Sequence, residues 1–313
     1  MASTQPGVPS LLRVLNDRST LELLLTDGAI TRAELGRRTG LSRVTASQSL
    51  ARLEARGLVE VVGSRSAGRG PNADVYAVRQ RVGRAVGVEL RAHAVGVTVA
   101  SVTGQTLATL TRTTDAAAVP AALAAIHAAL DEASVARDEV ATIVVGVPGV
   151  VDPASDDIGF SYDLVDAGMG LRGALSEAVG VPVVLENDVN LAAVAESHAG
   201  SAVGHADFVL VWVGSGVGLA VMVDGRLHRG STGAAGEIGY LPVPGVPLPE
   251  RVDHVSQGSF QRLVGSEALA ALARERGLLD DSADVAGALS RAMAADESFL
   301  DAIAARIALG VAA

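Results

Sequence analysis

Apolar residues recur with a helical period in the first quarter of the chain. Residues 21–25 form a short apolar segment that ends in an Asp-Gly turn signal. Thr31 is followed three residues later by Glu34, the spacing of a helix-capping box, and Ser42 is placed to cap a further helix that runs to about Arg56. The pattern therefore predicts three short helices in succession.

The third predicted helix has an inward and an outward face. Ala46, Leu50 and Leu53 lie at i, i+4 and i+7 and are expected to point to a core. The other side of its first turns is available to a partner, as in a recognition helix that meets base edges in the major groove of DNA. The residues expected to make this contact are Arg43, Val44, Ser47, Gln48 and Arg52.

A β-hairpin is predicted after the third helix, with strands over residues 59–62 and 74–78. The loop between them carries Arg65 and Arg69, which can reach phosphates or a minor groove. Three helices and a hairpin predict a winged helix-turn-helix DNA-binding domain over residues 1–84, expected to act as a dimer on two half-sites. A dimerisation or protein-docking module is the alternative.

From residue 85 the pattern changes to strands. Three β-rich runs, a helix beginning with a proline in its first turn, and a further strand are predicted over residues 85–90, 94–100, 106–112, 119–130 and 142–147. This order opens an α/β lobe of the ribonuclease H-like type, the fold of actin-like ATPases and sugar kinases. A second such lobe would begin near Phe208, which gives expected lobes of 85–200 and 201–313.

An apolar strand over residues 183–185 is followed at once by Glu186, Asn187 and Asp188, and a helical pattern begins near Asn190. α/β folds present ligand groups at such strand-to-helix junctions. An Asp here can take a proton from a sugar hydroxyl, and an Asn can both donate and accept a hydrogen bond. The alternative is that these side chains only cap the helix.

Charge divides the chain in two. Residues 1–84 contain 13 Arg and 7 acids, a formal charge of +6, whereas the remainder contains 12 Arg and 28 acids, a charge of −16. No Lys is present, and the net charge is −10. A basic first part on an acidic body predicts that only the first part meets a polyanion.

Composition narrows the class further. The chain has no cysteine, which excludes disulfides and thiolate metal sites. The most apolar stretch, residues 208–223, is interrupted by glycines and is expected to form two strands around a glycine turn, because a membrane span needs about 20 mostly apolar residues. No signal region begins the chain, so a cytoplasmic location without membrane attachment is expected.

Four short motifs carry a family resemblance. They read VPGVVD, ENDVN, GSGVG and GAAGEIG and occupy residues 147–152, 186–190, 214–218 and 233–239. In order and spacing they resemble the motifs of the ROK family of repressors and sugar kinases. With the winged helix in front, the resemblance is to the transcriptional regulators of that family, typified by xylose and N-acetylglucosamine repressors, and it covers nearly the entire chain.

The resemblance implies a set of sugar-binding residues. In the family's kinases, the Asp that matches Asp188 is the general base, and the Asn and Glu that match Asn187 and Glu237 hold sugar hydroxyls. Tyr240 stands where the family has a His that contacts zinc and sugar. The family's second sugar-binding Glu falls at Gln261, and its Asn-x-x-x-Trp sugar contact is not found over residues 160–164.

Other departures argue against catalysis and metal binding. The kinases hold ATP phosphates with an Asp-x-Gly-Gly-Thr turn, but residues 89–93 read ELRAH, which removes the close backbone approach that glycine allows. No enzymatic activity and no cofactor are therefore expected. The family's zinc cysteines are replaced within residues 251–260 by residues that include His254 and Ser259, and one His cannot hold a structural zinc.

Residues 263–276 and 297–309 are predicted as helices, and the chain ends in a helical pattern where family members continue, so the second lobe is expected to be incomplete. The sequence as a whole predicts a DNA-binding transcriptional regulator of carbohydrate-related genes with a non-catalytic sensor and dimerisation body. Its expected partners are a double-stranded DNA operator, a sugar or sugar-derivative effector, and further copies in a homodimer or homotetramer. An ATP-dependent sugar kinase and a ligand-independent DNA-binding regulator are the alternatives.

Overall fold

The computed structural model describes residues 9–66, 72–161, 164, 170–214, 216–248, 258–279 and 285–312. Contacts between residues divide the chain into two compact units. The first consists of residues 1–87, 96–111 and 124–143, and the second of residues 88–95, 112–123 and 144–313. The expected lobe boundaries after residues 84 and 200 stay predictions.

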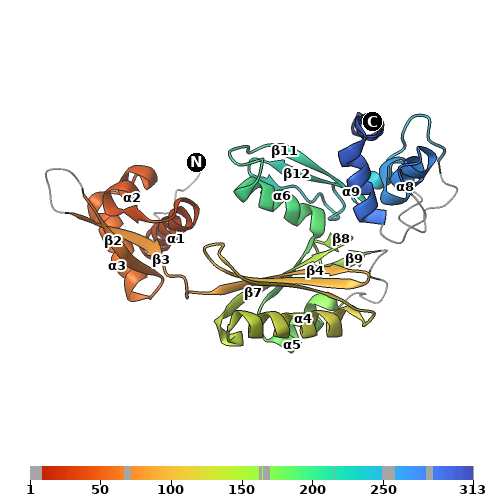
Figure 1. Ribbon diagram of the computed structural model, residues 1–313. Helices are drawn as coiled ribbons and strands as arrows, with labels where there is room; N and C mark the ends of the chain where they lie inside the picture. The colour runs from red at the N-terminus through yellow and green to blue at the C-terminus, as the bar shows by residue number, and fades with distance from the viewer. Residues whose placement is uncertain are drawn as a thin grey trace, which may run out of the picture. The chain divides into compact units, whose positions relative to one another are not determined.

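The first unit begins with a winged helix-turn-helix, as the sequence predicts (Figure 1). Its three strands form an antiparallel sheet in the order β1-β3-β2. The short β1 is not predicted by the sequence pattern, and α1 begins earlier than expected. The elements are α1 (Pro9–Asp27), β1 (Ile30–Thr31), α2 (Arg32–Thr39), α3 (Arg43–Ala55), β2 (Val59–Arg65) and β3 (Ala73–Val78).

Local hydrogen bonds fix the ends of α2 and α3. The Thr31 backbone N–H donates to Glu34 Oε2 at 2.8 Å, and the Glu34 N–H donates to Thr31 Oγ1 at 3.3 Å, which completes the predicted capping box. The Thr45 N–H donates to Ser42 Oγ at 3.1 Å at the start of α3. Gly40 has a φ of 71°, the left-handed conformation that ends α2 and turns the chain into α3.

The predicted inward face of α3 is confirmed. Ala46, Leu50 and Leu53 are all buried and join a core that also contains Leu35 of α2 and Tyr76 of β3. Val44, on the other side of α3, is 66% exposed. The helix is therefore held by one face and presents the other to solvent.

Five strands form the next sheet, in the order β10-β7-β4-β5-β6. The predicted strands and helix over residues 85–147 are all present, each with bounds within a few residues of expectation. They are β4 (Arg84–Arg91), β5 (Ala94–Ser101), β6 (Thr106–Thr113), α4 (Ala118–Ala133) and β7 (Val140–Val147), with a 3-10 turn, η1 (Arg137–Glu139), before β7. The predicted strand at residue 183 is β10 (Val183–Asn187).

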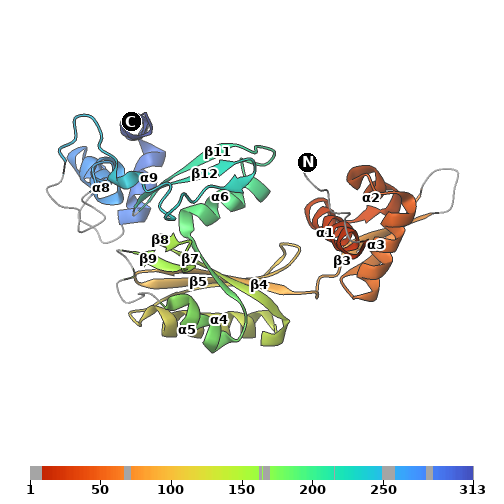
Figure 2. The ribbon, with the colours of Figure 1, turned by 180° about the vertical axis from the view of Figure 1, so that it is seen from behind.

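The second unit adds smaller elements around β10. A hairpin of β8 (Val150–Asp152) and β9 (Asp157–Phe160) and helix α5 (Leu171–Val179) precede it, and α6 (Asp188–Ala199) follows it directly. A second sheet has the order β11-β12-β13, with bounds Phe208–Val213, Val217–Val223 and Arg226–Leu227. Strand β11 pairs antiparallel with β12, which confirms the prediction of two strands around a glycine turn over residues 208–223. Helix α6 packs against both strands (Figure 2).

The last part of the chain is helical. It contains η2 (Ile238–Tyr240), α7 (Gln261–Val264), α8 (Ser266–Glu275), α9 (Val285–Ala295) and α10 (Glu297–Val311). Phe299 and Ile303 of α10 pack with Leu269 and Ala273 of α8. Every helix in the described part of the chain is too short or too polar to cross a lipid bilayer.

The prediction of one unbroken helix over residues 263–276 is wrong. The helix breaks at Gly265, whose ψ of 160° is extended. The Ser266 N–H donates to the Gly214 carbonyl at 3.1 Å, so a contact with a distant turn starts a new helix there. A Cβ at Gly265 would lie 2.3 Å from Gln261 Nε2, so the break also needs a residue without a side chain.

The two faces of α3 give a first testable prediction. Leu53→Ala removes a fully buried side chain and is expected to destabilise the winged helix by about 2 to 5 kcal/mol. Val44→Ala, on the exposed face of the same helix, is expected to change stability by less than about 0.5 kcal/mol. Amide hydrogen exchange of α3 measures both, and equal protection in the two variants would contradict the assigned faces.

Candidate functional site

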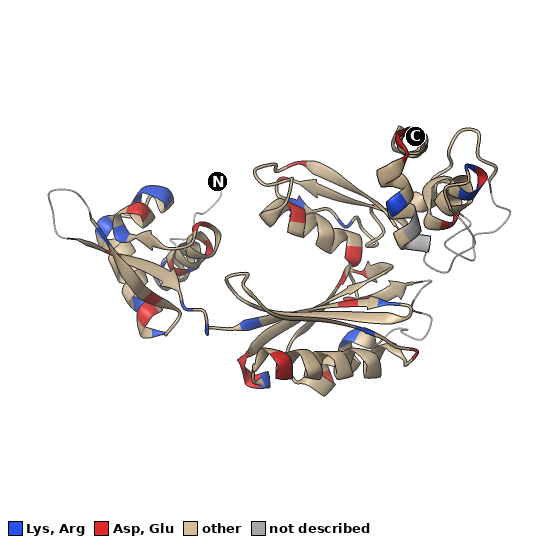
Figure 3. Ribbon diagram, viewed as in Figure 1, with Lys and Arg blue, Asp and Glu red and all other residues tan. Residues whose placement is uncertain are grey.

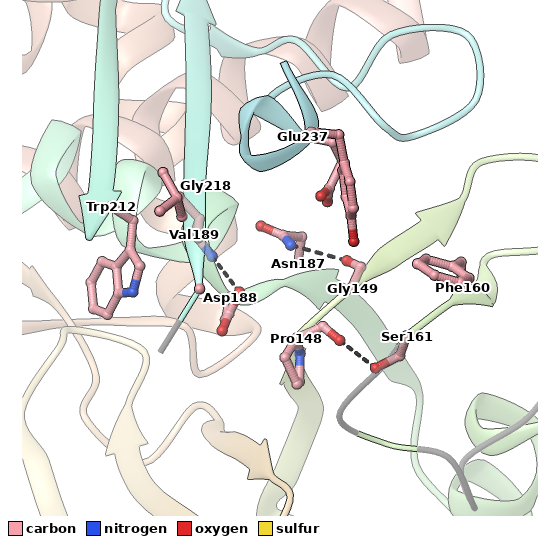
Figure 4. Close-up of a pocket in the computed structure, with 13 residues that line it drawn as sticks. Pro148, Gly149, Phe160, Ser161, Asn187, Asp188, Val189, Trp212, Gly218 and Glu237 are labelled. Atoms are coloured by element: carbon pink, nitrogen blue, oxygen red, sulfur yellow. Dashed lines mark hydrogen bonds between the residues drawn. The ribbon is translucent and has the colours of Figure 1, made fainter. Parts of the chain in front are cut away.

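All four sequence motifs contribute to one pocket of the second unit (Figure 4). The cavity between the lining residues has a volume of about 110 Å3. The motif residues in its wall are Pro148, Gly149, Asn187, Asp188, Val189, Gly216, Val217, Gly218 and Glu237. Tyr240 also lines it, so the pocket contains all four expected sugar-binding residues.

Asn187 joins the end of β10 to two neighbouring segments. Its Oδ1 accepts a hydrogen bond from the Asn190 N–H at 3.0 Å and so caps α6. Its Nδ2 donates to the Gly149 carbonyl at 3.0 Å, which ties the junction to the VPGVVD turn. The Asn187 side chain therefore both caps α6 and lines the pocket.

Asp188 is the first residue of α6 and lines the same pocket. Its Oδ1 accepts from the Val189 N–H at 2.9 Å. The positive end of the helix dipole stabilises a negative charge at this position. A carboxylate oxygen of Asp188 can therefore accept a hydrogen bond from a ligand hydroxyl.

Glu186, just before this pair, is buried and fully engaged. Arg229 contacts its Oε2 through Nε at 2.8 Å and Nη2 at 2.5 Å. Its Oε1 accepts from Asn190 Nδ2 at 2.9 Å and from the Asn187 N–H at 3.0 Å. One buried carboxylate thus connects the β10–α6 junction to the loop that follows β13.

That loop continues to Glu237 through three glycines with positive φ, of which Gly233 and Gly236 lie against neighbouring backbone. A Cβ at Gly236 (φ +98°) would lie 1.7 Å from the Leu219 carbonyl oxygen, and one at Gly233 (φ +81°) would lie 2.0 Å from the Val151 carbonyl oxygen. Only glycine fits either place. The motif GAAGEIG therefore packs against β12 and β8 and brings Glu237 to the pocket.

Burial, together with the nearby charge of Asp188, raises the pKa of Glu237 above its ordinary value of 4.5. The raised pKa favours the neutral form of Glu237, which can donate a hydrogen bond, while an oxygen of Asp188 can accept one. A ligand with adjacent hydroxyl groups, each both donor and acceptor, matches this arrangement.

Sequence reasoning missed two aromatic residues of the pocket. Trp212, at the end of β11, is 47% exposed, and Phe160, at the end of β9, is 46% exposed. A Cβ at Gly214 would lie 2.8 Å from Trp212 Nε1, so the indole lies against the glycine turn. The signal was available, because Trp212 is the single tryptophan of the chain and stands two residues before the GSGVG motif.

Gln261, another position singled out in the sequence, lies outside the pocket wall. Gln261 is buried and its Oε1 accepts from the Val217 N–H at 2.8 Å, so it supports the backbone beside the glycine turn. His254 is outside the described residues. Among the residues that are described, no cluster of three or more His, Asp or Glu side chains is placed to hold a metal ion.

The expected DNA contacts on α3 divide into two groups. Arg43, Val44 and Gln48 are exposed, and Ser47 is half-buried. Arg52 instead turns to α1, where its Nη2 lies 2.6 Å from Asp17 Oδ1 and its Nε 3.1 Å from Oδ2.

The Arg52 contact belongs to a small buried network. Ser49 Oγ also donates to Asp17 Oδ1, at 2.7 Å. Burial favours the neutral acid, but the hydrogen bonds from Arg52 and Ser49 outweigh it and lower the pKa of Asp17. Arg52 thus has a partner within the protein, a contact that sequence spacing does not reveal.

The wing carries the remaining two expected contacts. Arg65 ends β2 and is 57% exposed, with its Nη1 at 2.8 Å from Glu34 Oε1. Arg69 lies outside the described residues. Arg positions are also visible on α2 and near the start of α3 (Figure 3).

Winged helix and pocket together define a two-part class of protein, a helix-turn-helix domain followed by a sugar-kinase-like α/β domain. The ROK family model matches residues 85–313, and the MarR family model matches residues 16–70. The chain belongs to the ROK family.

Named relatives are regulators as well as kinases. The DNA-binding transcriptional dual regulator NagC of Escherichia coli K12 is 28% identical over 269 residues, which cover 85% of this chain and 66% of NagC. The xylose repressor of Bacillus subtilis 168 is 23% identical over 238 residues, 75% of this chain and 62% of the repressor. The chain therefore spans slightly less than two thirds of the length of these relatives.

Solved structures show the same fold. A ROK family transcriptional regulator, a homologue of the E. coli MLC protein, is 17% identical with a TM-score of 0.72, covering 96% of this chain and 80% of its own. A ROK glucokinase of Streptomyces griseus in complex with glucose and AMPPNP is 28% identical with a TM-score of 0.61, covering 74% and 78%.

The Glu186–Arg229 pair gives a second prediction. Arg229→Ala leaves a buried carboxylate without its cation and is expected to destabilise the second unit by on the order of 2 kcal/mol. Arg226→Ala, three residues earlier at an exposed position, should cost less than about 0.5 kcal/mol. Urea denaturation measures both. Adding Glu186→Gln to Arg229→Ala should recover part of the loss, and a further loss in the double variant would contradict the pairing.

Glu237 gives a third prediction, on pH. Because its folded-state pKa is raised, its stabilising contribution is fully present below 4.5 and is lost as pH rises through the folded pKa. Glu237→Gln is therefore expected to be more stable than the wild type at neutral pH, with the difference disappearing toward pH 4. Denaturant midpoints across pH test this, with Glu177→Gln at an exposed site of α5 as control. A Glu237→Gln difference that grows as pH falls would contradict the account.

Proposed function

We propose that the protein is a DNA-binding transcriptional regulator whose ROK domain binds a sugar or sugar derivative as an effector. The observation that carries the proposal is a pocket lined by Asn187, Asp188 and Glu237 in the same chain as a winged helix with an exposed, arginine-bearing face. The names of the regulator relatives support this function.

The DNA would be held chiefly by α3 and the wing. Arg43, Val44, Ser47 and Gln48 would meet base edges in the major groove, and Arg65 and Arg69 would contact phosphates. Arg52 instead supports α3 against α1 while its bonds to Asp17 are intact. A homodimer or homotetramer would supply the second half-site contact that tight binding requires.

The sugar would lie over Asn187, Asp188, Glu237 and Tyr240. Asp188 would accept from one hydroxyl, and Glu237 in its neutral form would donate to a neighbouring oxygen. Trp212 offers an apolar indole beside these polar groups. Polar groups on one side and an aromatic ring on the other suit a sugar ring, which has both polar edges and apolar C–H faces.

Phosphoryl transfer is the alternative, and the likeness to the S. griseus glucokinase favours it. The turn between β4 and β5 argues against it. Glu89 is engaged by Arg91, with Arg91 Nε at 2.7 Å from Glu89 Oε1, and Ala92 and His93 bring side chains where a phosphate-binding turn needs bare backbone. We propose a sensor without kinase activity, which a coupled ATP assay with glucose, xylose and N-acetylglucosamine checks. Turnover with any of these would support the kinase instead.

The pocket's single tryptophan makes sugar binding directly measurable. A sugar that enters is expected to change Trp212 fluorescence, and Asp188→Ala should weaken that sugar by about tenfold or more, because it removes a charged acceptor. Val184→Ala, at a half-exposed position of β10 outside the pocket wall, is the matched control. Equal affinity in the Asp188 variant and the wild type would exclude the assigned site.

A further inference from the structure

A second concave surface lies within the winged helix, between α2 and the start of β3. We name it the α2–β3 groove; it encloses about 700 Å3. Ala33, Gly36 and Ala73 line it with small side chains or none, which leaves room for a ligand beside α2. Its other lining residues include three arginines, Arg32, Arg37 and Arg43.

The three arginines differ in their partners. Arg32 donates to the Tyr76 hydroxyl, lies 5.3 Å from the centre of the Tyr76 ring, and has its Nη2 at 3.3 Å from Asp74 Oδ2. Asp74 is the one acid among the described residues that line the groove. Its ion pair with Arg32 balances its negative charge. Arg37 and Arg43 are exposed and form no ion pair with any described acid.

Two guanidinium groups without an ion-pair partner among the described acids, beside an open space, favour an anion. The planar guanidinium donates two parallel hydrogen bonds to a phosphate, so a phosphate group is the ligand that fits best. Arg43 begins α3, the helix proposed to enter the major groove of DNA. A DNA strand at the edge of the major groove would therefore run beside the α2–β3 groove of the protein. Phosphate contacts of this kind fix the position of a protein on the duplex.

We propose that the α2–β3 groove binds a backbone phosphate of DNA, with Arg37 of α2 as its ligand. This inference rests on the proposed DNA-binding function and adds α2 to α3 and the wing as a contact. Arg37 contributes affinity without sequence preference, because every nucleotide carries the same phosphate.

Arg38 provides a matched control. It neighbours Arg37 on α2 and has the same chemistry, but its Nη1 is paired with Asp27. It does not line the groove. A general effect of lost positive charge would weaken DNA binding equally in variants of Arg37 and Arg38. A phosphate bound in the groove would instead weaken binding in the Arg37 variant alone.

The test measures fluorescence anisotropy of a labelled 30-base-pair duplex of random sequence, titrated with the full chain at several salt concentrations. Arg37→Gln is expected to weaken binding by about tenfold at low salt and to reduce the slope of log affinity against log salt by about one. Arg37→Lys should retain the slope, because it retains the charge. Arg38→Gln should change affinity by less than about twofold, as expected for a residue without a phosphate contact.

The outcomes separate the two claims. Wild-type binding with loss only in Arg37→Gln supports the groove. Wild-type binding that is equally strong in Arg37→Gln, or equally weakened in both Gln variants, overturns the groove and leaves the DNA-binding function in place. If the wild-type chain does not bind the duplex at low salt, both the phosphate site in the groove and the DNA-binding function are overturned.

Discussion

The candidate pocket depends on one ion pair, between the buried Glu186 and the half-exposed Arg229. Glu186 is almost entirely removed from solvent, and a carboxylate in that position is stable only when it is paired and hydrogen-bonded. Arg229 and Asn190 supply those bonds, and they come from the loop after β13 and from α6. The pair therefore fixes the β10–α6 junction, with Asn187 and Asp188, relative to the loop that ends at Glu237.

The same principle assigns roles to charged residues elsewhere in the chain. Arg52 has a buried carboxylate partner, Asp17, and serves the fold, whereas Arg37 and Arg43 form no ion pair with any described acid and remain able to bind a polyanion. The pocket shows the opposite case, in which the charged neighbour of an acid is another acid. Burial, together with the nearby acid Asp188, raises the pKa of Glu237 and so favours its neutral form, which can donate a hydrogen bond to an uncharged polar ligand.

Features set by neighbours in sequence were predictable, and features set by distant contacts were not. The capping box of Thr31 and Glu34 and the buried face of α3 depend on spacing within one helix, so the pattern identifies them. The Arg52 bond to Asp17 spans 35 residues, and the break at Gly265 depends on the Gly214 carbonyl. Trp212 was missed because its place in the pocket depends on distant segments, among them those of Asp188 and Glu237, which form the wall with it.

The central claim is that one chain couples a sugar pocket to a DNA-binding surface, and linkage makes that coupling reciprocal. The most direct test titrates a sugar against the full chain by Trp212 fluorescence, first without DNA and then with a saturating duplex selected from genomic fragments. Coupling predicts that the two dissociation constants for the sugar differ by about fivefold or more. Equal constants, for a sugar and a duplex that both bind, would contradict the account.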